Sequence, residues 1–176
     1  ASVTYGIEDV SRIFTHELVR HRHASPSQES MRFVRLDQLE AYWPDAFNTL
    51  PDEQRTAVEK IFRDTFERAE ADQVLLATLL DMDNSDMPFA AKKKLQSAMR
   101  RMIPDGILTG IILTANHRTW RDSIEKRTSR HAEEEIRKVF SMIAMDLEER
   151  FPAIYQDMVI EDVDGIAECT FKHGTS

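Results

Sequence analysis

The chain of 176 residues is poor in cysteine and glycine and has no long hydrophobic run. Its one cysteine, Cys169, cannot form an internal disulfide, which favours a reducing, cytoplasmic environment. No apolar run approaches the roughly 18 residues that a membrane span requires, so a membrane-spanning protein is excluded. The opening stretch ASVTYGIEDV has neither the basic nor the apolar region of a secretory signal, so we expect no signal peptide there.

Composition and net charge narrow the classes of protein to which the chain can belong. Hydrophobic residues make up 41% of the chain and charged residues 31%, as in globular proteins, and the length suits one domain over residues 1–176. A net charge of −8 argues against a surface that grips a polynucleotide. Basic residues nevertheless crowd two stretches, 20–35 and 92–130, and guanidinium groups suit small phosphate-bearing anions.

Hydrophobic periodicity predicts an α+β protein with a small mixed or antiparallel sheet flanked by helices. A strand is expected over residues 3–7, and then a helix on which Val10, Phe14 and Leu18 share a face. Pro26 and the residues before it predict that this helix ends near Arg22. The further elements expected are a short strand over 33–36, a helix from 51 that stops within 81–86, a helix over 88–102, a buried strand over 107–114, and one or two helices within 110–152.

The sharpest local signal is the stretch RHRHASPSQESMR, Arg20 to Arg32, which reads R-H-R, seven residues, then S-x-R. A chance match to five fixed positions has a probability on the order of 10⁻⁴. Glu17 and Arg20 lie three residues apart, so we expect them on one helix face, and Ser30 follows on a loop. These groups together suit a phosphate. Along the later helix, polar groups recur every three or four residues: Asn116, Trp120, Ser123, Arg127 and His131.

The motif resembles the signature of the flavin-dependent thymidylate synthases. The likeness extends upstream through SRIFTHELVRHR and downstream over residues 100–137. The resemblance implies a single catalytic domain over 1–176 with the fold of that family and without the family's N-terminal segment, assembled as a homotetramer whose sites are shared between subunits.

The activity that this resemblance implies is methylation of uracil C5 in dUMP. Methylenetetrahydrofolate provides the carbon, reduced FAD provides the electrons, and NADPH recharges the flavin. The lone Cys169, far in sequence from the motif, argues against a thiolate mechanism. Three departures from the family pattern (Glu17, Asp122 and Lys126) point to the compact UMP/dUMP C5-methylase branch of nucleoside antibiotic biosynthesis, such as the polyoxin pathway, in which UMP is also accepted.

The resemblance also assigns site residues. Arg127 is the catalytic residue, which draws charge onto the N3 and O2 edge of uracil. The substrate-binding residues implied are Glu17, Leu18, Val19, Arg20, Gln28, Glu29, Ser30, Met31, Arg32, Arg100 and Arg127. The flavin-binding residues implied are Arg20, His21, Arg22, Gln28, Asn116, His117, Arg118, Asp122 and His131.

Several of these assignments have plainer alternatives. The motif arginines can form a solvated basic face, or they can bind an RNA backbone, although no aromatic stacking motif accompanies them. Histidines at 16, 21 and 23 lack the spacing of a metal site, so no metal is expected. Ser30 is expected to donate a hydrogen bond to the nucleotide, since no base that would make it a nucleophile is evident.

Two further pairs leave alternatives open. Arg118 and Asp122 can form an i, i+4 salt bridge or contact the flavin. Glu17 can accept a hydrogen bond from a ribose hydroxyl, or it can pair with an arginine such as Arg20 or Arg100.

Overall fold

The computed structural model describes residues 1–28, 30 and 39–173. Backbone contacts divide the chain into two compact units. The first unit comprises Ala1–Ile7, Phe14–Ser27 and Ile111–Ser176, and the second comprises Glu8–Ile13 and Gln28–Gly110. The strand expected over 33–36 lies outside the described residues.

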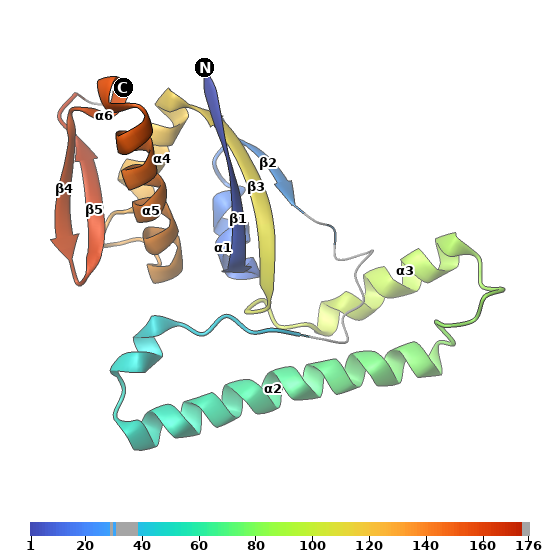
Figure 1. The fold of residues 1–176 in the computed structure, drawn as a ribbon. Coiled ribbons are helices and arrows are strands. Elements are labelled where there is room, and N and C mark those ends of the chain that lie inside the picture. The colour runs from blue at the N-terminus through green and yellow to red at the C-terminus, as the bar shows by residue number, and fades with distance from the viewer. Residues whose placement is uncertain (29, 31–38, 174–176) are drawn as a thin grey trace. The chain divides into compact units, whose positions relative to one another are not determined.

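A three-stranded sheet has the order β1-β3-β2, formed by β1 (Ser2–Ser11), β3 (Leu108–Asn116) and β2 (Ser25–Gln28) (Figure 1). The strand expected over 3–7 is longer than predicted, and Val10 belongs to β1 and not to a helix. Asp9 has φ 57°, a left-handed conformation that shifts the side-chain alternation of a strand. This shift puts buried Val10 three residues after buried Ile7, a spacing that imitates a helix.

Helix α1 (Arg12–Leu18) ends one turn before the predicted end at Arg22. The backbone N–H groups of Arg20 and His21 donate to the carbonyls of Glu17 and Leu18, three residues earlier, so these residues form a turn. Arg20 therefore does not share a helix face with Glu17, which corrects the sequence interpretation. The physical reason is the short distance along the chain to β2, which begins at Ser25 and requires the backbone to leave helical geometry.

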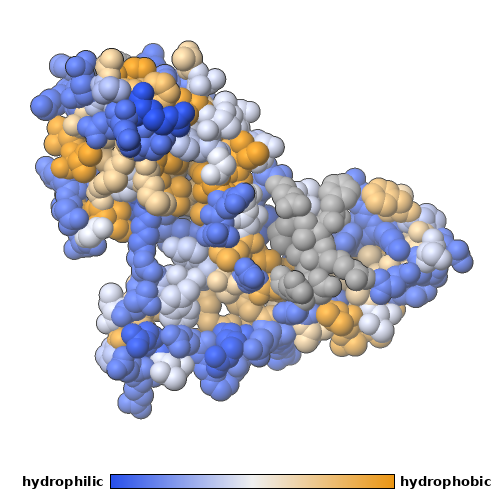
Figure 2. All heavy atoms as spheres, viewed as in Figure 1, coloured by the Kyte–Doolittle hydropathy of each residue, from blue (hydrophilic) through white to orange (hydrophobic). Residues whose placement is uncertain are grey.

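The second unit is mainly helical. The long helix α2 (Asp52–Leu79) follows a 3₁₀ turn, η1 (Asp45–Thr49), and the shorter helix α3 (Phe89–Met99) continues into a second 3₁₀ turn, η2 (Arg100–Met102). Both helices agree with the sequence prediction. An aromatic cluster packs between the residues around η1 and the middle of α2: Trp43, Phe47, Phe62 and Phe66. Hydrophilic side chains cover much of the face of α2 that is visible in Figure 2.

The first unit ends in helices and a hairpin. Helices α4 (His117–Arg127), α5 (Glu134–Arg150) and α6 (Pro152–Tyr155) precede strands β4 (Met158–Val163) and β5 (Ile166–Phe171). The last two strands pair antiparallel, from Met158 opposite Phe171 to Val163 opposite Ile166 (Figure 1). Both α4 and α5 fall within the predicted helical window of 110–152.

The sequence interpretation predicted no strands after residue 152 and missed this hairpin. Cys169 lies within β5 and has no exposed surface. The signal that predicts the hairpin is the pair Asp164–Gly165, whose positive φ angles of 58° and 79° suit a two-residue type I′ turn.

The observed elements confirm the α+β class with small sheets and flanking helices. Trp120, Phe140 and Leu147 have no exposed surface and form the core of the first unit with other apolar side chains of α4 and α5. Among the described residues, no helix combines the length and the apolar character that crossing a membrane needs.

Candidate functional site

Arg127, the last residue of α4, is held by three hydrogen bonds within the first unit. Its Nη1 donates to Oε2 of Glu17 at 2.9 Å, and its Nη2 donates to the Glu17 carbonyl at 3.1 Å. Its Nε donates to Nε2 of His21 at 2.8 Å. The Arg127 side chain is 17% exposed and the Glu17 side chain 29%, so the ion pair is partly shielded from water. The R-H-R motif and the later arginine therefore meet at one place.

His21 lies between Arg127 and a second residue of α4. The Oγ of Ser123 is 3.2 Å from Nδ1 of His21, and Ser123 is buried. Burial and the positive charge of Arg127 lower the pKa of His21 from 6.5 to about 4. The imidazole is therefore neutral at pH 7, and Arg127 and Ser123 each contact one of its nitrogens.

The ends of α4 are fixed by local contacts. At its start, Oδ1 of Asn116 accepts a hydrogen bond from the backbone N–H of Thr119 at 2.9 Å, an N-cap. At its end, Oγ1 of the buried Thr128 donates to the Ile124 carbonyl at 2.8 Å and accepts from the backbone N–H of Cys169 at 2.8 Å. These contacts tie the residue after Arg127 to strand β5.

Two expected members of the α4 face lie outside the helix. Asn116 is the N-cap, and His131 lies in the exposed connection between α4 and α5. The helix ends at Arg127 because the Thr128 side chain turns back to a helical carbonyl and the chain then leads to the N-cap of α5 at Glu133. Trp120, Ser123 and Arg127 remain on α4, where Trp120 belongs to the core.

A polar pocket of about 540 Å³ lies at the outer side of α4. The residues that line it are His23, Asn116, Arg118, Thr119, Asp122 and Lys126. Asp122 pairs with Lys126 at 2.7 Å, one turn later, and not with Arg118, which corrects the salt-bridge alternative. The guanidinium of Arg118 therefore lines the pocket without neutralisation by that carboxylate.

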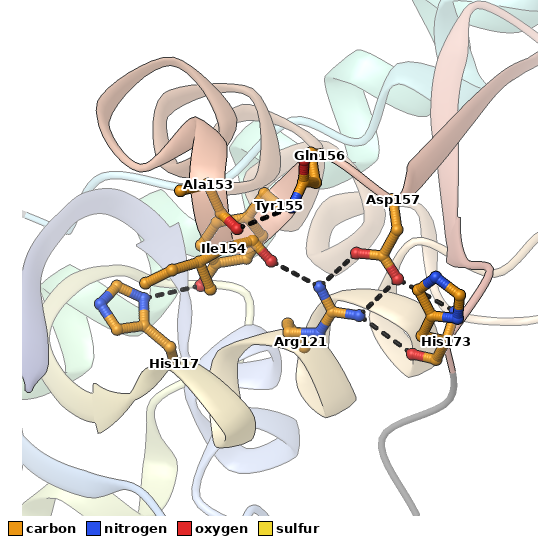
Figure 3. A network of polar contacts seen from close by, with 8 residues as sticks. All are labelled: His117, Arg121, Ala153, Ile154, Tyr155, Gln156, Asp157 and His173. Atoms are coloured by element: carbon orange, nitrogen blue, oxygen red, sulfur yellow. Dashed lines mark hydrogen bonds and ion pairs between the residues drawn. The ribbon is translucent and has the colours of Figure 1, made fainter.

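A second polar network joins α4 to the hairpin, and sequence reasoning missed it. Arg121 donates to both carboxylate oxygens of Asp157, at 2.6 and 2.8 Å, and to the carbonyls of Ile154 and His173 (Figure 3). These hydrogen bonds hold the pKa of Asp157 well below its usual range. Arg121 also lies over the Phe171 ring, 4.0 Å from its centroid. No short motif marks this pair, because 36 residues separate its members.

His117 faces the same network. Its Nδ1 lies 3.1 Å from the hydroxyl of Tyr155 (Figure 3). Its ring also contacts that of Phe151 at an edge. His117 does not line the polar pocket that Asn116 and Arg118 share.

The remaining expected site residues are dispersed. Arg20 and Arg22 are exposed in the turn after α1, whereas Leu18 is buried and Val19 is 48% exposed. Gln28, in β2, donates to Oγ1 of Thr109, and Arg100 is half-buried in η2, so both belong to the second unit. Ser30 is half-buried. Glu29, Met31 and Arg32 lie outside the described residues.

Comparisons with known proteins agree with the sequence resemblance. The family model described as "Thymidylate synthase complementing protein" matches residues 1–153. A flavin-dependent thymidylate synthase of Mycobacteroides abscessus is 35% identical over 162 residues, which are 91% of this chain and 63% of that protein. A flavin-dependent thymidylate synthase of Corynebacterium efficiens is 33% identical over 176 residues, which are 99% of this chain and 69% of that protein.

Solved structures show the same fold. A crystal structure of the flavin-dependent thymidylate synthase ThyX of Helicobacter pylori, complexed with FAD and dUMP, superposes with a TM-score of 0.61 at 19% identity, over 89% of this chain and 72% of that one. A second structure of that enzyme superposes with a TM-score of 0.57 at 20% identity, over 88% of this chain and 69% of that one.

The fold defines the class, an α+β protein with the architecture of the flavin-dependent thymidylate synthases. More specifically, the chain belongs to the thymidylate synthase complementing protein family. It spans 63% of the length of the Mycobacteroides relative.

Proposed function

We propose that the protein methylates C5 of uracil in dUMP, UMP or both, with methylenetetrahydrofolate as the carbon donor. Reduced FAD, recharged by NADPH, supplies the electrons when it is bound. The family assignment supports the reaction class. The observation that carries the proposal is the convergence of Glu17 and His21, from the motif region, on Arg127.

Arg127 has the chemistry that the reaction requires. A guanidinium has five N–H donors, and the three hydrogen bonds to Glu17 and His21 use three of them. One N–H on each terminal nitrogen remains for a ligand with adjacent acceptors. Stabilising negative charge on the N3 and O2 edge of uracil increases the electron density at C5, which then acts as the carbon nucleophile.

The side chains around α4 fit an anionic cofactor such as FAD. The polar pocket presents the guanidinium of Arg118 and the amide of Asn116, and such donors suit a pyrophosphate, whereas the ammonium of Lys126 is paired with Asp122. We propose that Asn116, Arg118 and Asp122 contact the flavin cofactor, and that the exposed Arg20 and Arg22 contribute further cations.

Cys169 has no place in this reaction. Its thiol is buried, and burial raises its pKa to about 11. A thiol with such a pKa is protonated at pH 7 and is a poor nucleophile.

We further propose that the active protein is a cytoplasmic homotetramer with sites shared between subunits. The resemblance to the family supports this assembly and the sharing of sites. The departures at Glu17, Asp122 and Lys126 support acceptance of UMP.

Release of tritium from C5-labelled dUMP and UMP tests the proposal, with FAD, NADPH and methylenetetrahydrofolate present. We expect release with at least one nucleotide, and yellow protein after incubation with FAD and gel filtration. Arg101→Ala is the control variant for this assay and should behave as the wild type. Arg101 is exposed, and its side chain donates only to the Ser97 carbonyl among the described residues. Folded protein that binds no flavin and releases no tritium, but binds RNA, would overturn the proposal.

A further inference from the structure

The orientation of Arg127 depends on which nitrogen of His21 carries the proton. The Arg127 Nε–H donates to Nε2 of His21 at 2.8 Å, so Nε2 must be an unprotonated acceptor. A neutral imidazole then has its proton on Nδ1. The contact of 3.2 Å between Nδ1 and Oγ of Ser123 is therefore a hydrogen bond from His21 to Ser123.

The alternative tautomer is incompatible with this arrangement. A proton on Nε2 would face the Nε–H of Arg127, and two donors would then lie 2.8 Å apart. The unprotonated Nδ1 would still find a partner, because a serine hydroxyl can donate or accept. The Arg127 contact thus selects the tautomer, and the Ser123 hydroxyl satisfies the proton that this selection leaves on Nδ1.

Packing limits the ways in which the ring can move. The centroid of the His21 ring lies 6.1 Å from that of the Phe140 ring, and Phe140 has no exposed surface. Ser123 is only 3% exposed. Rotating the imidazole by half a turn would put carbon atoms where Nδ1 and Nε2 lie, and both hydrogen bonds would be lost. Without Ser123 the Nδ1–H would be left without its partner in a largely buried place, which destabilises the tautomer that Arg127 needs.

We infer that Ser123 is a positioning residue for Arg127: its hydroxyl accepts the Nδ1–H of His21 and holds the ring in the orientation in which Nε2 contacts the guanidinium. Ser123 and Arg127 lie one turn apart on α4, so the same helix carries the arginine and the group that orients its partner. Glu17 holds the two terminal nitrogens from the other side. The consequence for turnover rests on the proposed function, whereas the tautomer does not.

The test compares Ser123→Ala with Ser141→Ala. Ser141 is the matched control, because it is also buried on a helix of the first unit and its Oγ donates to the Ala167 carbonyl at 2.8 Å. The ¹⁵N chemical shifts of the His21 ring report the tautomer in the purified protein without any substrate. We expect a protonated Nδ1 in the wild type and in Ser141→Ala. In Ser123→Ala we expect a mixture of tautomers, because the ring without its Nδ1–H acceptor can leave the Arg127 contact that selects Nδ1–H.

Turnover provides the second readout. We expect Ser123→Ala to lower kcat about tenfold with KM nearly unchanged, because a misdirected guanidinium stabilises the transition state less. Ser123→Thr, which keeps the hydroxyl, should recover the Nδ1–H signal and part of kcat.

An unchanged Nδ1–H tautomer in Ser123→Ala would overturn the inference, and so would an equal loss of kcat in Ser141→Ala. Absence of turnover in the wild type would refute the proposed function, while the tautomer measurement would still decide the role of Ser123.

Discussion

Glu17 and Arg127 form an ion pair between residues 110 positions apart in the sequence, with Oε2 of Glu17 2.9 Å from Nη1 of Arg127. From the sequence, Glu17 could accept a hydrogen bond from a ribose hydroxyl or pair with an arginine such as Arg20 or Arg100. The structure places a different arginine on this carboxylate. The negative charge of Glu17 therefore lies beside the guanidinium that we assign to the uracil.

Replacing Glu17 by glutamine tests what this carboxylate does. The amide oxygen of Glu17→Gln can still accept from Arg127, but its negative charge is gone. We expect tighter binding of UMP and dUMP, by a similar factor of a few-fold, because the anionic nucleotides then meet less repulsion. Calorimetry with both nucleotides and the ratio of their kcat/KM values provide the measurement. A ratio that moves toward dUMP would instead show that Glu17 accepts a ribose hydroxyl.

Much of the helical fold could be predicted from local patterns. The helix from Asp52 to Leu79 has a proline before it and a long periodic face, and both are local signals. The end of β1 could not be predicted in this way. The left-handed residue Asp9 shifts the alternation of buried and exposed side chains, so that Val10 has the spacing of a helical residue. The early end of α1 depends on where β2 begins, which is a tertiary constraint.

Some features of the candidate site could likewise be predicted from the sequence, and others could not. The R-H-R motif and Arg127 are visible in the sequence, but the contact between them requires the fold. Ser123 carries no motif of its own, and only its spacing of four from Arg127 indicates a shared face. The pair of Arg121 and Asp157 has no local signal, because its two residues come from α4 and from the segment before β4.

Removing Arg127 should abolish the reaction while the assembly persists. Arg127→Ala is expected to reduce tritium release at least a hundredfold, because the charge that develops on the uracil loses its stabilising group. Arg127→Lys should recover little, since an ammonium cannot reproduce the forked donors. Light scattering should show an unchanged mass, because the partly exposed side chain is not part of the core. Turnover near that of the wild type in Arg127→Ala would refute the catalytic role.

Removing the thiol of Cys169 should leave turnover intact. We expect Cys169→Ala to keep wild-type tritium release, because a buried thiol with a raised pKa takes no part in the chemistry. Its melting temperature should fall modestly, since the smaller side chain leaves a cavity beneath β5. Loss of activity without a change in folding, measured by circular dichroism, would point to a thiolate mechanism.

Neutralising Asp157 should loosen the C-terminal hairpin. Asp157→Asn removes the charge that Arg121 contacts with two nitrogens, and the partly buried guanidinium then has no carboxylate partner among the described residues. We expect a lower melting temperature and faster hydrogen exchange in β4 and β5. Asp72→Asn is the control, because Asp72 is paired with Arg68 on the exposed side of α2. Equal effects of the two variants would show that the ion pair of Arg121 and Asp157 stabilises the hairpin no more than an exposed ion pair stabilises α2.

Lowering the pH should weaken the first unit through His21. The folded protein holds the pKa of His21 at about 4, against 6.5 in an unfolded chain, so the unfolded state binds the extra proton first as the pH falls. The stability that neutral His21 provides is therefore complete above about pH 6.5 and is lost progressively down to about pH 4, by a few kcal/mol at most. Protonation at the lower end also removes the acceptor for the Nε–H of Arg127 and places two positive charges side by side.

His21→Gln separates this contribution from general acid denaturation, because glutamine does not titrate and its amide oxygen can accept from Arg127. We expect the melting temperature of the wild type to fall more steeply than that of His21→Gln between pH 6.5 and 4. Titration of the His21 ring by NMR should show a midpoint well below 6.5. Parallel melting curves for the two proteins, or a midpoint near 6.5, would contradict the burial of a neutral His21 against Arg127.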